Sequence, residues 1–468
     1  MRYVSTRGSA PPVGFADVLL SGLAPDRGLY VPESWPTVCR PEDLDGLTYV
    51  GSAVRILSAF VGDVFDEATL RRLVETAYRR FDHPEVVPLR RLREGLWLME
   101  LFWGPTLAFK DLALQVVGGM FEEELSRRET SMTVLGATSG DTGSAAIEAC
   151  RDRAGLSIFV LHPHGRVSEI QRRQMTTVLS DNVHNLAVRG TFDDCQAIVK
   201  TLFADEEFAS RARLGSVNSI NWARIAAQVV YYARAATRLS AEGPVTFVVP
   251  TGNFGNVFAA WVARRCGAPI GKLVVASNSN DVLPRWLESG VLEKRDVVPT
   301  LSPSMDIQVS SNLERLLFEA SGRDGEAVAE LLGRFEATGR AEVPPPWMDE
   351  VRELFDAERL DDVATVETIA AVHRDFGIVV DPHTAVGVGV AETRTLTPPV
   401  VVAATAHPAK FPEAVERAIG VRPELPPRLA DLTERPERMT IVDADATQVR
   451  QVIEDSLFGQ PEGRGSAR

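Results

Sequence analysis

The sequence predicts an α/β protein in which two mostly parallel β-sheets carry helices on both faces, preceded by an N-terminal helical region. Two observations lead to this prediction. Short apolar runs rich in β-branched residues alternate with helix-like segments from Trp97 onward, which is typical of strands buried in a parallel sheet. The chain also has 468 residues, of which 45% are hydrophobic, so it is long enough for two or three domains.

The first 92 residues lack this alternation of strands and helices. We expect helices at 15–22, 53–61 and 67–81 and one short strand at 29–32. His83-Pro84 and Pro88 mark the end of the region, because proline interrupts regular structure. We interpret residues 1–92 as a helical region with a structural role, packed on the rest of the chain.

The main body is expected to span residues 93–430. Its predicted strands lie at 97–102, 133–136, 156–161, 182–188, 245–249, 272–276, 378–382 and 400–404. We expect a smaller subdomain at about 125–215 and a larger one from the remainder. Residues 285–365 interrupt the alternation of strands and helices. We interpret them as a largely helical insertion with a solvated face. Residues 431–468 form a C-terminal extension with a flexible tail at 459–466.

The composition excludes several classes of function. A net charge of −14 argues against non-specific binding of nucleic acids or anionic membranes. The N-terminus lacks an apolar signal core, and no apolar run approaches the ~18 residues of a membrane span, so we expect a cytoplasmic protein. The four cysteines lack metal-ligand spacing, so they predict buried reduced thiols and no metal site: Cys39, Cys150, Cys195 and Cys266.

One octapeptide, from Gly104 to Asp111, places Lys110 in an apolar setting. Gly104-Pro105 interrupts the preceding segment, and apolar residues flank Lys110 on both sides. Removal of water destabilises a charged amine, which frees it to act as the nucleophile of a Schiff base or as a proton acceptor. The same octapeptide also fits a lysine at a helix start whose stem lies along apolar surface.

Two small-residue loops, at 138–143 and 250–256, each follow a strand-like run and open a helix-like segment. Such loops present backbone N–H groups and the positive end of a helix dipole to an anion. Each loop alone is equally consistent with a tight connection between a strand and a helix. Together with an apolar lysine, the two loops describe a site for a phosphorylated carbonyl cofactor.

These three segments, in this order and spacing, resemble threonine synthase, a family of fold-type II pyridoxal-phosphate (PLP) enzymes. Further matching segments lie at 23–32, 216–224, 302–315 and 405–411. The resemblance extends from about residue 3 to residue 420 and is to the longer bacterial and fungal branch, which carries an extra N-terminal region. It implies a fold like that of the tryptophan synthase β-subunit.

The resemblance implies roles in cofactor binding. Lys110 would carry PLP and, once freed by substrate, move protons. Asp141 would lie beside the phenolic oxygen of the cofactor, and Thr405 would meet its pyridine nitrogen, leaving that nitrogen unprotonated. The cofactor phosphate would lie on the N-terminal end of a helix, against Gly252, Asn253, Phe254, Gly255 and Asn256.

The implied substrate is O-phospho-L-homoserine. Ser139, Gly140 and Thr142 would hold its α-carboxylate, and we assign Thr106 to the same substrate-binding set. The reaction would give L-threonine and phosphate by γ-elimination and β-addition of water, so the enzyme would be a carbon–oxygen lyase acting on a phosphate ester.

A second group of residues would bind the substrate phosphate. Asn218, Ser219 and Arg224 lie on a loop that leads into a helix, and arginine supplies a fork of donors matched to phosphate. Lys410 is a further cationic candidate. Without the resemblance, the favoured interpretation of Arg224 is a solvated helix face with Asn and Ser as its N-cap. A surface turn fits Lys410 equally well.

The chain departs from the family pattern at two positions. Trp103 stands where the family usually has His, and Arg27 where it usually has Gly. Because Trp103 is close to Lys110, a specialised paralogue acting on a related phosphorylated or phosphonate amino acid stays open as an alternative. A non-catalytic PLP-binding relative is the second alternative. We expect the protein to be a monomer or a homodimer.

Overall fold

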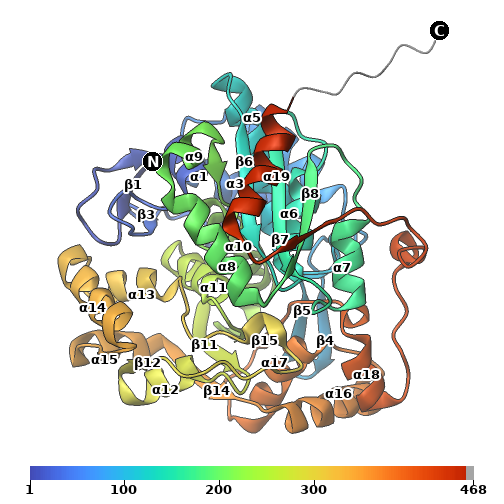
Figure 1. Ribbon diagram of the computed structural model, residues 1–468. Coiled ribbons are helices and arrows are strands. Elements are labelled where there is room, and N and C mark those ends of the chain that lie inside the picture. The colour runs from blue at the N-terminus through green and yellow to red at the C-terminus, as the bar shows by residue number, and fades with distance from the viewer. Residues whose placement is uncertain (460–468) are drawn as a thin grey trace. The chain divides into compact units, whose positions relative to one another are not determined.

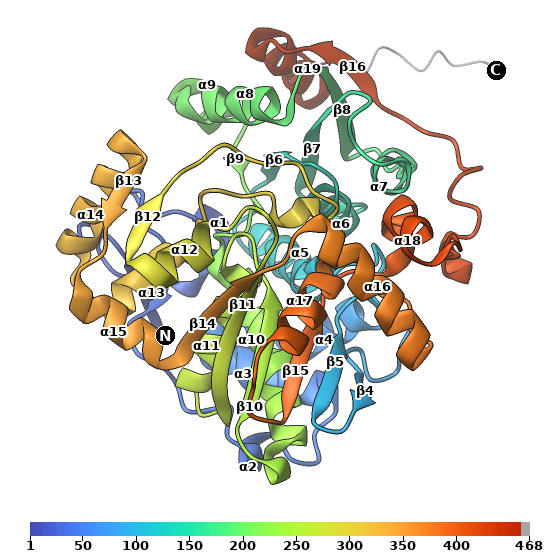
Figure 2. The same ribbon diagram turned by 90° about the horizontal axis from the view of Figure 1, so that it is seen from below.

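Two mostly parallel β-sheets, each within its own unit of the chain, confirm the predicted α/β fold class (Figures 1 and 2). The computed structural model describes residues 1–459. One unit comprises residues 1–120 and 218–430, and the other comprises residues 121–217 and the chain from 431 onward. Each unit is therefore assembled from two stretches that are distant in the sequence.

The strands of the first unit are β1 (Arg2–Ser5), β2 (Val13–Gly14), β3 (Tyr30–Pro32), β4 (Leu89–Arg93), β5 (Leu96–Glu100), β10 (Val245–Pro250), β11 (Ile270–Ser277), β12 (Val291–Glu293), β13 (Arg340–Glu342), β14 (Phe355–Arg359) and β15 (Val400–Ala404). Its helices are α1 (Phe15–Ser21), α2 (Pro41–Leu44), α3 (Tyr49–Val61), α4 (Glu67–Tyr78), α5 (Lys110–Arg127, which continues past the unit boundary), α10 (Trp222–Arg238), α11 (Gly255–Arg265), α12 (Val282–Ser289), α13 (Leu313–Ala320), α14 (Gly325–Thr338), α15 (Pro345–Leu354), α16 (Asp362–Phe376), α17 (Pro382–Thr393) and α18 (Pro412–Ile419).

The main sheet of the first unit has six strands in the order β14-β11-β10-β15-β5-β4, which Figure 2 shows fanned side by side. All neighbouring strands are parallel except β4 and β5. Adjacent residues of β10 face opposite sides: Val248 lies in the apolar cluster with α16 and α17, while the Phe247 ring contacts Tyr232 of α10 at 4.9 Å. Since both faces are covered, β10 is apolar almost throughout.

The structure adds strands that the sequence pattern did not predict. The first 92 residues contain α1 to α4 but also a small antiparallel sheet, in which the predicted strand β3 pairs with β1, and β1 with β2, neither of which was predicted. Within 285–365, β14 joins the main sheet as a parallel edge strand beside β11. The strand predicted at 378–382 is absent from the structure: Asp381 instead caps the N-terminus of α17, with Pro382 as its first residue.

The second unit contains a five-stranded parallel sheet in the order β16-β8-β7-β6-β9. Its elements are β6 (Met132–Ala137), α6 (Asp141–Cys150), β7 (Leu156–Pro163), α7 (Glu169–Thr176), β8 (Val183–Arg189), α8 (Phe192–Ala204), α9 (Glu206–Arg211), β9 (Leu214–Gly215), β16 (Thr440–Asp443) and α19 (Ala446–Phe458). Residues 431–459 thus supply an edge strand and a helix of this unit rather than a separate extension (Figure 1). Apart from Gly459, the predicted flexible tail lies outside the described residues.

None of the helices in residues 1–459 is long and apolar enough to cross a membrane. The same part of the chain has no cluster of side chains that could hold a metal ion. All four cysteines are buried and form no disulfide.

Candidate active site

The carboxyl ends of β5 and β15 bring Lys110 and Thr405 together. The two strands are parallel neighbours, so the segments that follow them leave from the same edge of the sheet. The Phe109 N–H donates to the Thr405 carbonyl at 2.9 Å, and the His407 N–H donates to the Leu107 carbonyl at 3.0 Å. These bonds fix the segment before Lys110 against the segment that contains Thr405.

Lys110 is the first residue of α5 and is only 8% exposed. Its Nζ donates to the Ser304 hydroxyl at 3.4 Å and lies 5.3 Å from the centre of the Phe109 ring. The structure therefore places this amine in the apolar setting that the octapeptide predicts.

Buried hydrogen bonds shape the loop before Lys110. Asp111, which is fully buried, accepts the Thr106 N–H at 2.7 Å and the Thr106 hydroxyl at 2.8 Å. Burial raises the pKa of the Asp111 carboxyl, and the bonds from Thr106 oppose that shift. A side chain at Gly104 would collide with Asp111, because a Cβ there would lie 2.5 Å from the Asp111 Cβ. The loop thus requires glycine at 104 and a hydrogen-bonding residue at 106.

Two cations complete this loop. The fully buried Lys410 donates from Nζ to the Thr106 carbonyl at 2.7 Å. Arg428 donates to the Gly104 carbonyl and pairs with Asp82 at 2.6 Å. Thr106 and Lys410 therefore both take part in the internal bonding of the Lys110 loop, and their roles in substrate binding stay a prediction.

The loop between β10 and α11 has the backbone of an anion site. Phe254 adopts a left-handed conformation with φ of +64°, immediately before α11 begins at Gly255. At Gly252 a Cβ would lie 2.6 Å from the carbonyl oxygen of Ser304, so only glycine fits there. The loop leads directly into the N-terminal end of α11, a helix of eleven residues. The dipole of this helix favours a negative charge bound at the loop.

Asn256, in the first turn of α11, adds a side-chain donor to this loop. Its Oδ1 accepts the hydroxyl protons of Tyr231 at 2.5 Å and of Tyr232 at 2.9 Å. Its Nδ2 is buried without a hydrogen-bond partner among the described residues. A buried N–H donor of this kind needs an acceptor, and a phosphate bound at the helix N-terminus supplies one. The loop therefore fits the phosphate of PLP.

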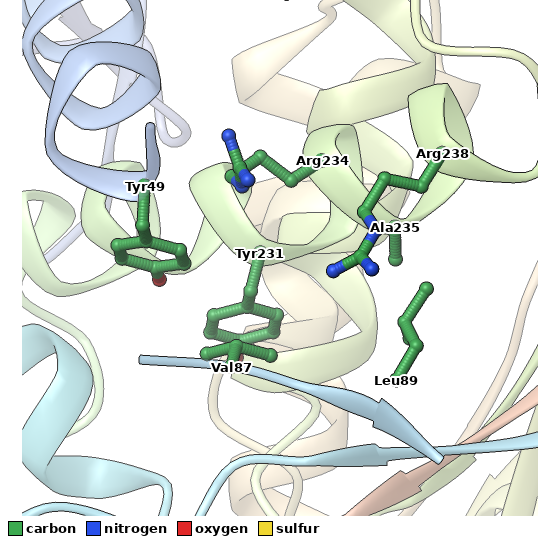
Figure 3. A pocket seen from close by; sticks show the side chains of 7 residues that line it. All are labelled: Tyr49, Val87, Leu89, Tyr231, Arg234, Ala235 and Arg238. Atoms are coloured by element: carbon green, nitrogen blue, oxygen red, sulfur yellow. The ribbon is translucent and has the colours of Figure 1, made fainter. Parts of the chain in front are cut away.

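Tyr231, which bonds Asn256, also lines a small pocket beside α10 (Figure 3). The pocket is lined by Tyr49, Val87, Leu89, Tyr231, Arg234, Ala235 and Arg238. Arg234 donates to the Leu47 carbonyl at 2.7 Å and lies over the Tyr49 ring at 5.8 Å. The pocket thus belongs to the contact between α3 and α10.

The segment from Asn218 to Arg224 lies beside the phosphate loop. The Ser219 hydroxyl is 3.5 Å from that of Ser311, which in turn donates to Asn253 Oδ1 at 3.4 Å. Arg224 is in the first turn of α10 and only 3% exposed, which contradicts the alternative of a solvated arginine. Burial lowers the pKa of Arg224 to about 10, so its guanidinium stays charged at neutral pH.

A second buried arginine, Arg315, ties three segments together. It donates to the Tyr30 carbonyl at 2.9 Å, to the Ile220 carbonyl at 2.6 Å and to Asn312 Oδ1. Asn312 in turn donates from its backbone and its side chain to the Asn253 carbonyl, at 3.1 and 3.0 Å. One guanidinium therefore holds the phosphate loop, the 218–224 segment and the N-terminal strand β3.

His407 and Trp103 flank the Lys110 loop. Burial lowers the pKa of His407 to about 4, so its imidazole is neutral at pH 7, and its Nδ1 accepts the Ala409 N–H at 3.2 Å. Trp103 donates from Nε1 to Glu100 at 3.0 Å, and its ring lies 5.3 Å from that of His83. His407 thus caps the short 3₁₀ turn Pro408–Lys410.

The second unit carries the predicted loop 138–143 at the end of β6. The Thr138 hydroxyl accepts the N–H groups of Gly140 at 3.0 Å and Gly143 at 2.9 Å. Asp141 begins α6, and its Oδ1 accepts Nε2 of Gln171 at 2.9 Å. The sequence neighbours of Asp141 include Ser139, Gly140 and Thr142. All four predicted residues therefore lie at the N-terminus of α6.

Several residues of these sites were missed by sequence reasoning. They are Asp111, Ser304, Asn312, Arg315 and Gln171. The segment 302–315 resembles the family, and this was the signal that could have pointed to Ser304, Asn312 and Arg315. Gln171 lies on a helix with no motif, so nothing in the sequence marked it.

Comparison with family models divides the chain into three matched regions. Residues 2–78 match the model described as threonine synthase N terminus, and residues 384–453 match threonine synthase, C-terminal. Residues 82–332 match the pyridoxal-phosphate dependent enzyme model.

Individual relatives extend the similarity over nearly the whole chain. Threonine synthase of Pseudomonas aeruginosa is 52% identical, with 97% of this chain and 98% of that protein covered. A crystal structure of PLP-bound threonine synthase from Brucella melitensis superimposes with a TM-score of 0.95 at 48% identity, covering 97% of this chain and 99% of that one. Yeast threonine synthase gives a TM-score of 0.92 at 38% identity, with coverage of 97% and 98%.

Proposed function

The chain belongs to the threonine synthase family of PLP-dependent enzymes, and we propose that it converts O-phospho-L-homoserine and water to L-threonine and phosphate. One observation carries this proposal within the first unit. Ser304 contacts the buried amine of Lys110 through its hydroxyl, and its carbonyl lies against Gly252 of the phosphate loop. An amine that can bind a carbonyl and a loop that can bind a phosphate are thus linked through one residue.

The described residues suit PLP as the cofactor. Lys110 would hold it covalently, and Gly252, Asn253, Phe254, Gly255 and Asn256 would hold its phosphate. Thr405 and Asp141 are proposed to meet its ring nitrogen and its phenolic oxygen. When bound, PLP supplies an electron sink for charge that develops on substrate carbon atoms. The freed Lys110 amine would then carry protons between those carbons.

We assign the substrate phosphate to Asn218, Ser219 and Arg224. Arg224 is buried and charged, and a desolvated guanidinium binds an anion more strongly than an exposed one. Ser139, Gly140 and Thr142 would bind the α-carboxylate through the helix N-terminus that they share. Thr106 and Lys410 complete the proposed set through the loop that carries Lys110.

We further propose that the enzyme acts in the cytoplasm as a monomer or a homodimer. The absence of a disulfide among its four buried cysteines supports an intracellular, reducing setting.

The test is a comparison of substrates with the purified, PLP-loaded protein. We expect phosphate and threonine from O-phospho-L-homoserine and no comparable release of phosphate from O-phosphoserine, with serine as an unphosphorylated control. Preference for O-phosphoserine would instead support the paralogue with another elimination reaction. Turnover of none of these substrates, with PLP bound, would support a non-catalytic relative.

Lys110→Ala tests the covalent attachment. We expect this variant to lose the yellow colour of bound PLP that borohydride bleaches, and to lose turnover, because no other amine is proposed to bind the cofactor. Its far-ultraviolet circular dichroism should match that of the wild type. An unchanged absorption spectrum in Lys110→Ala would contradict the assignment.

A further inference from the structure

Hydrogen bonds connect Asp381 to Lys110 through His383 and through the backbone and side chain of Ser304. Asp381 Oδ2 is 2.7 Å from His383 Nδ1, and His383 Nε2 accepts the backbone N–H of Ser304 at 3.2 Å. The Ser304 hydroxyl then accepts from Lys110 Nζ at 3.4 Å. All four residues belong to the first unit, and Lys110, Ser304 and the Asp381–His383 pair come from three distant parts of the sequence. The proposed function uses Lys110 and notes the contacts of Ser304, but it assigns no catalytic role to Ser304, His383 or Asp381.

The bonding partners fix the tautomer of His383. Because Nε2 accepts an N–H from Ser304, it carries no proton, so the ring proton lies on Nδ1 and donates to Asp381. Asp381 is itself immobilised as the N-cap of α17, where it accepts the N–H groups of His383 at 2.9 Å and Thr384 at 3.1 Å. His383 is 2% exposed and Asp381 is fully buried, which shields these bonds from water.

His383 controls where Ser304 lies. Ser304 is in the short 3₁₀ turn Pro303–Met305, and its backbone N–H is the group bound by the imidazole. Its carbonyl lies against Gly252, where a Cβ would be only 2.6 Å away. The backbone of Ser304 is thus held on two sides, and its hydroxyl is directed to Lys110.

We propose that Ser304 is a further catalytic residue, which orients the ε-amine of Lys110, and that His383 and Asp381 are positioning residues that fix Ser304. This proposal rests on the proposed function. A neutral amine can take a proton from substrate carbon only if its lone pair points at that carbon. When the Ser304 hydroxyl accepts one N–H of the amine, it restricts rotation about the terminal C–N bond and so directs the lone pair. Hydrogen bonds of this kind are long in the ligand-free enzyme and shorten in the reacting complex.

The competing explanation is that this chain only stabilises the fold. Ser302, the N-cap of the same turn, offers a control two residues earlier. It is buried whereas Ser304 is half-buried, so removal of the Ser302 hydroxyl tests the stability of this turn at least as severely. That hydroxyl contacts Asn278 Nδ2 at 3.1 Å and Thr300 Oγ1 at 3.3 Å. Ser302→Ala should therefore share any loss of stability with Ser304→Ala but not an effect on Lys110.

The experiment compares Ser304→Ala with Ser302→Ala by two measurements. In the PLP-loaded enzymes we expect Ser304→Ala to lower kcat about tenfold, the effect of one net hydrogen bond, with KM changed by less than about twofold. In the cofactor-free proteins we expect Lys110 of the Ser304→Ala variant to bind added PLP covalently more slowly than Lys110 of the wild type. Borohydride traps the covalent product, and mass spectrometry measures the fraction of protein that carries it. Ser302→Ala should leave both quantities near the wild-type values.

His383 provides a second pair of variants in case Ser304→Ala folds poorly. His383→Leu removes the acceptor for the Ser304 N–H and should lower kcat and the capture rate as Ser304→Ala does. His383→Gln, whose amide oxygen reaches the position of Nε2, should recover part of both. The double variant Ser304→Ala/His383→Leu should be no slower than the worse single variant, because both changes remove one interaction.

Equal capture rates and equal kcat in Ser304→Ala and Ser302→Ala would overturn the proposal. So would additive losses in the double variant. Capture of PLP requires no substrate, so this result is independent of whether the wild type makes threonine. A wild type that captures PLP normally but makes no threonine would overturn the proposed function and leave the capture test of Ser304 intact.

Discussion

Arg315 and Arg224 are both buried in the first unit, and we assign them different roles. Arg315 is fully buried, lies over the Trp222 ring at 5.7 Å and donates to three oxygen acceptors, so its position is set by the fold. Burial lowers the pKa of Arg315 to about 9 and that of Arg224 to about 10. Both remain charged at pH 7, and a buried charge favours any anion that can reach it. For Arg224, the proposed anion is the substrate phosphate.

Arg224→Ala should weaken turnover of O-phospho-L-homoserine and spare the binding of PLP. Loss of a buried, charge-assisted pair removes about 2–4 kcal/mol of transition-state binding, or roughly 30- to 1000-fold in kcat/KM. Arg224→Lys should recover only part of this loss, because an ammonium cannot form the bidentate fork. Steady-state kinetics provide the measurement, and near wild-type kcat/KM in the alanine variant would reopen the assignment of the substrate.

Site residues could be predicted from the sequence where a local motif carries the chemistry. Lys110 lies in a distinctive octapeptide, and Gly252 to Asn256 lie in a strand–loop–helix pattern, so local sequence alone marks both segments as candidates. His383 reaches Ser304 across 79 positions of the sequence, and Arg315 reaches Tyr30 across 285. Contacts between residues so far apart in the sequence depend on the tertiary arrangement of the elements, which a local sequence pattern does not encode.

The turn at Arg27 shows why the departure from the family pattern at this position matters. Arg27 adopts φ of +66° in the turn that joins the Ala24 carbonyl to the Arg27 N–H at 2.8 Å. This left-handed conformation strains any residue with a Cβ, which explains the glycine that the family usually has there. The Arg27 side chain is 76% exposed and pairs with Glu336 at 3.7 Å, a contact of little energetic value.

Arg27→Gly should therefore stabilise the fold relative to Arg27→Ala. Both variants lose the exposed ion pair, and only glycine relieves the strained backbone, so we expect a difference of about 0.5–1 kcal/mol in the free energy of unfolding. Urea titration followed by circular dichroism measures it. A glycine variant that is less stable than the alanine variant would show that the turn is not strained.

Among whole elements, apolar strands were predictable and polar ones were not. The strand predicted at 245–249 corresponds to β10, whose residues are all buried. β14 has the sequence Phe-Asp-Ala-Glu-Arg and lies at the sheet edge, where partly exposed positions accept polar residues. The opposite error occurred at 378–382, where Ile378 and Val380 are buried but the segment leads into a helix cap. Burial alone does not distinguish a strand from a packed loop.

At the scale of the molecule, each unit is completed by chain from far along the sequence. In the second unit, β16 pairs with β8, and α19 buries Val449 and Ile453 in the cluster that includes Cys195 of α8. A chain ending after residue 430 should lose this packing, and rapid proteolysis within 121–217 should follow. A chain ending after residue 459 keeps every described element and should resist protease like the full-length protein. Equal resistance of the shorter chain would contradict this dependence.

The pairing of β16 with β8 has a consequence for synthesis on the ribosome. While the chain is being made, residues 121–217 emerge more than two hundred positions before the strand that completes their sheet. Until then β8 exposes an unpaired backbone edge and the apolar residues that α19 later covers, which is the condition in which nascent chains associate with one another. Efficient production of this protein should therefore depend on how quickly translation reaches the codons of β16 and α19, and on chaperones that protect β8 during that interval.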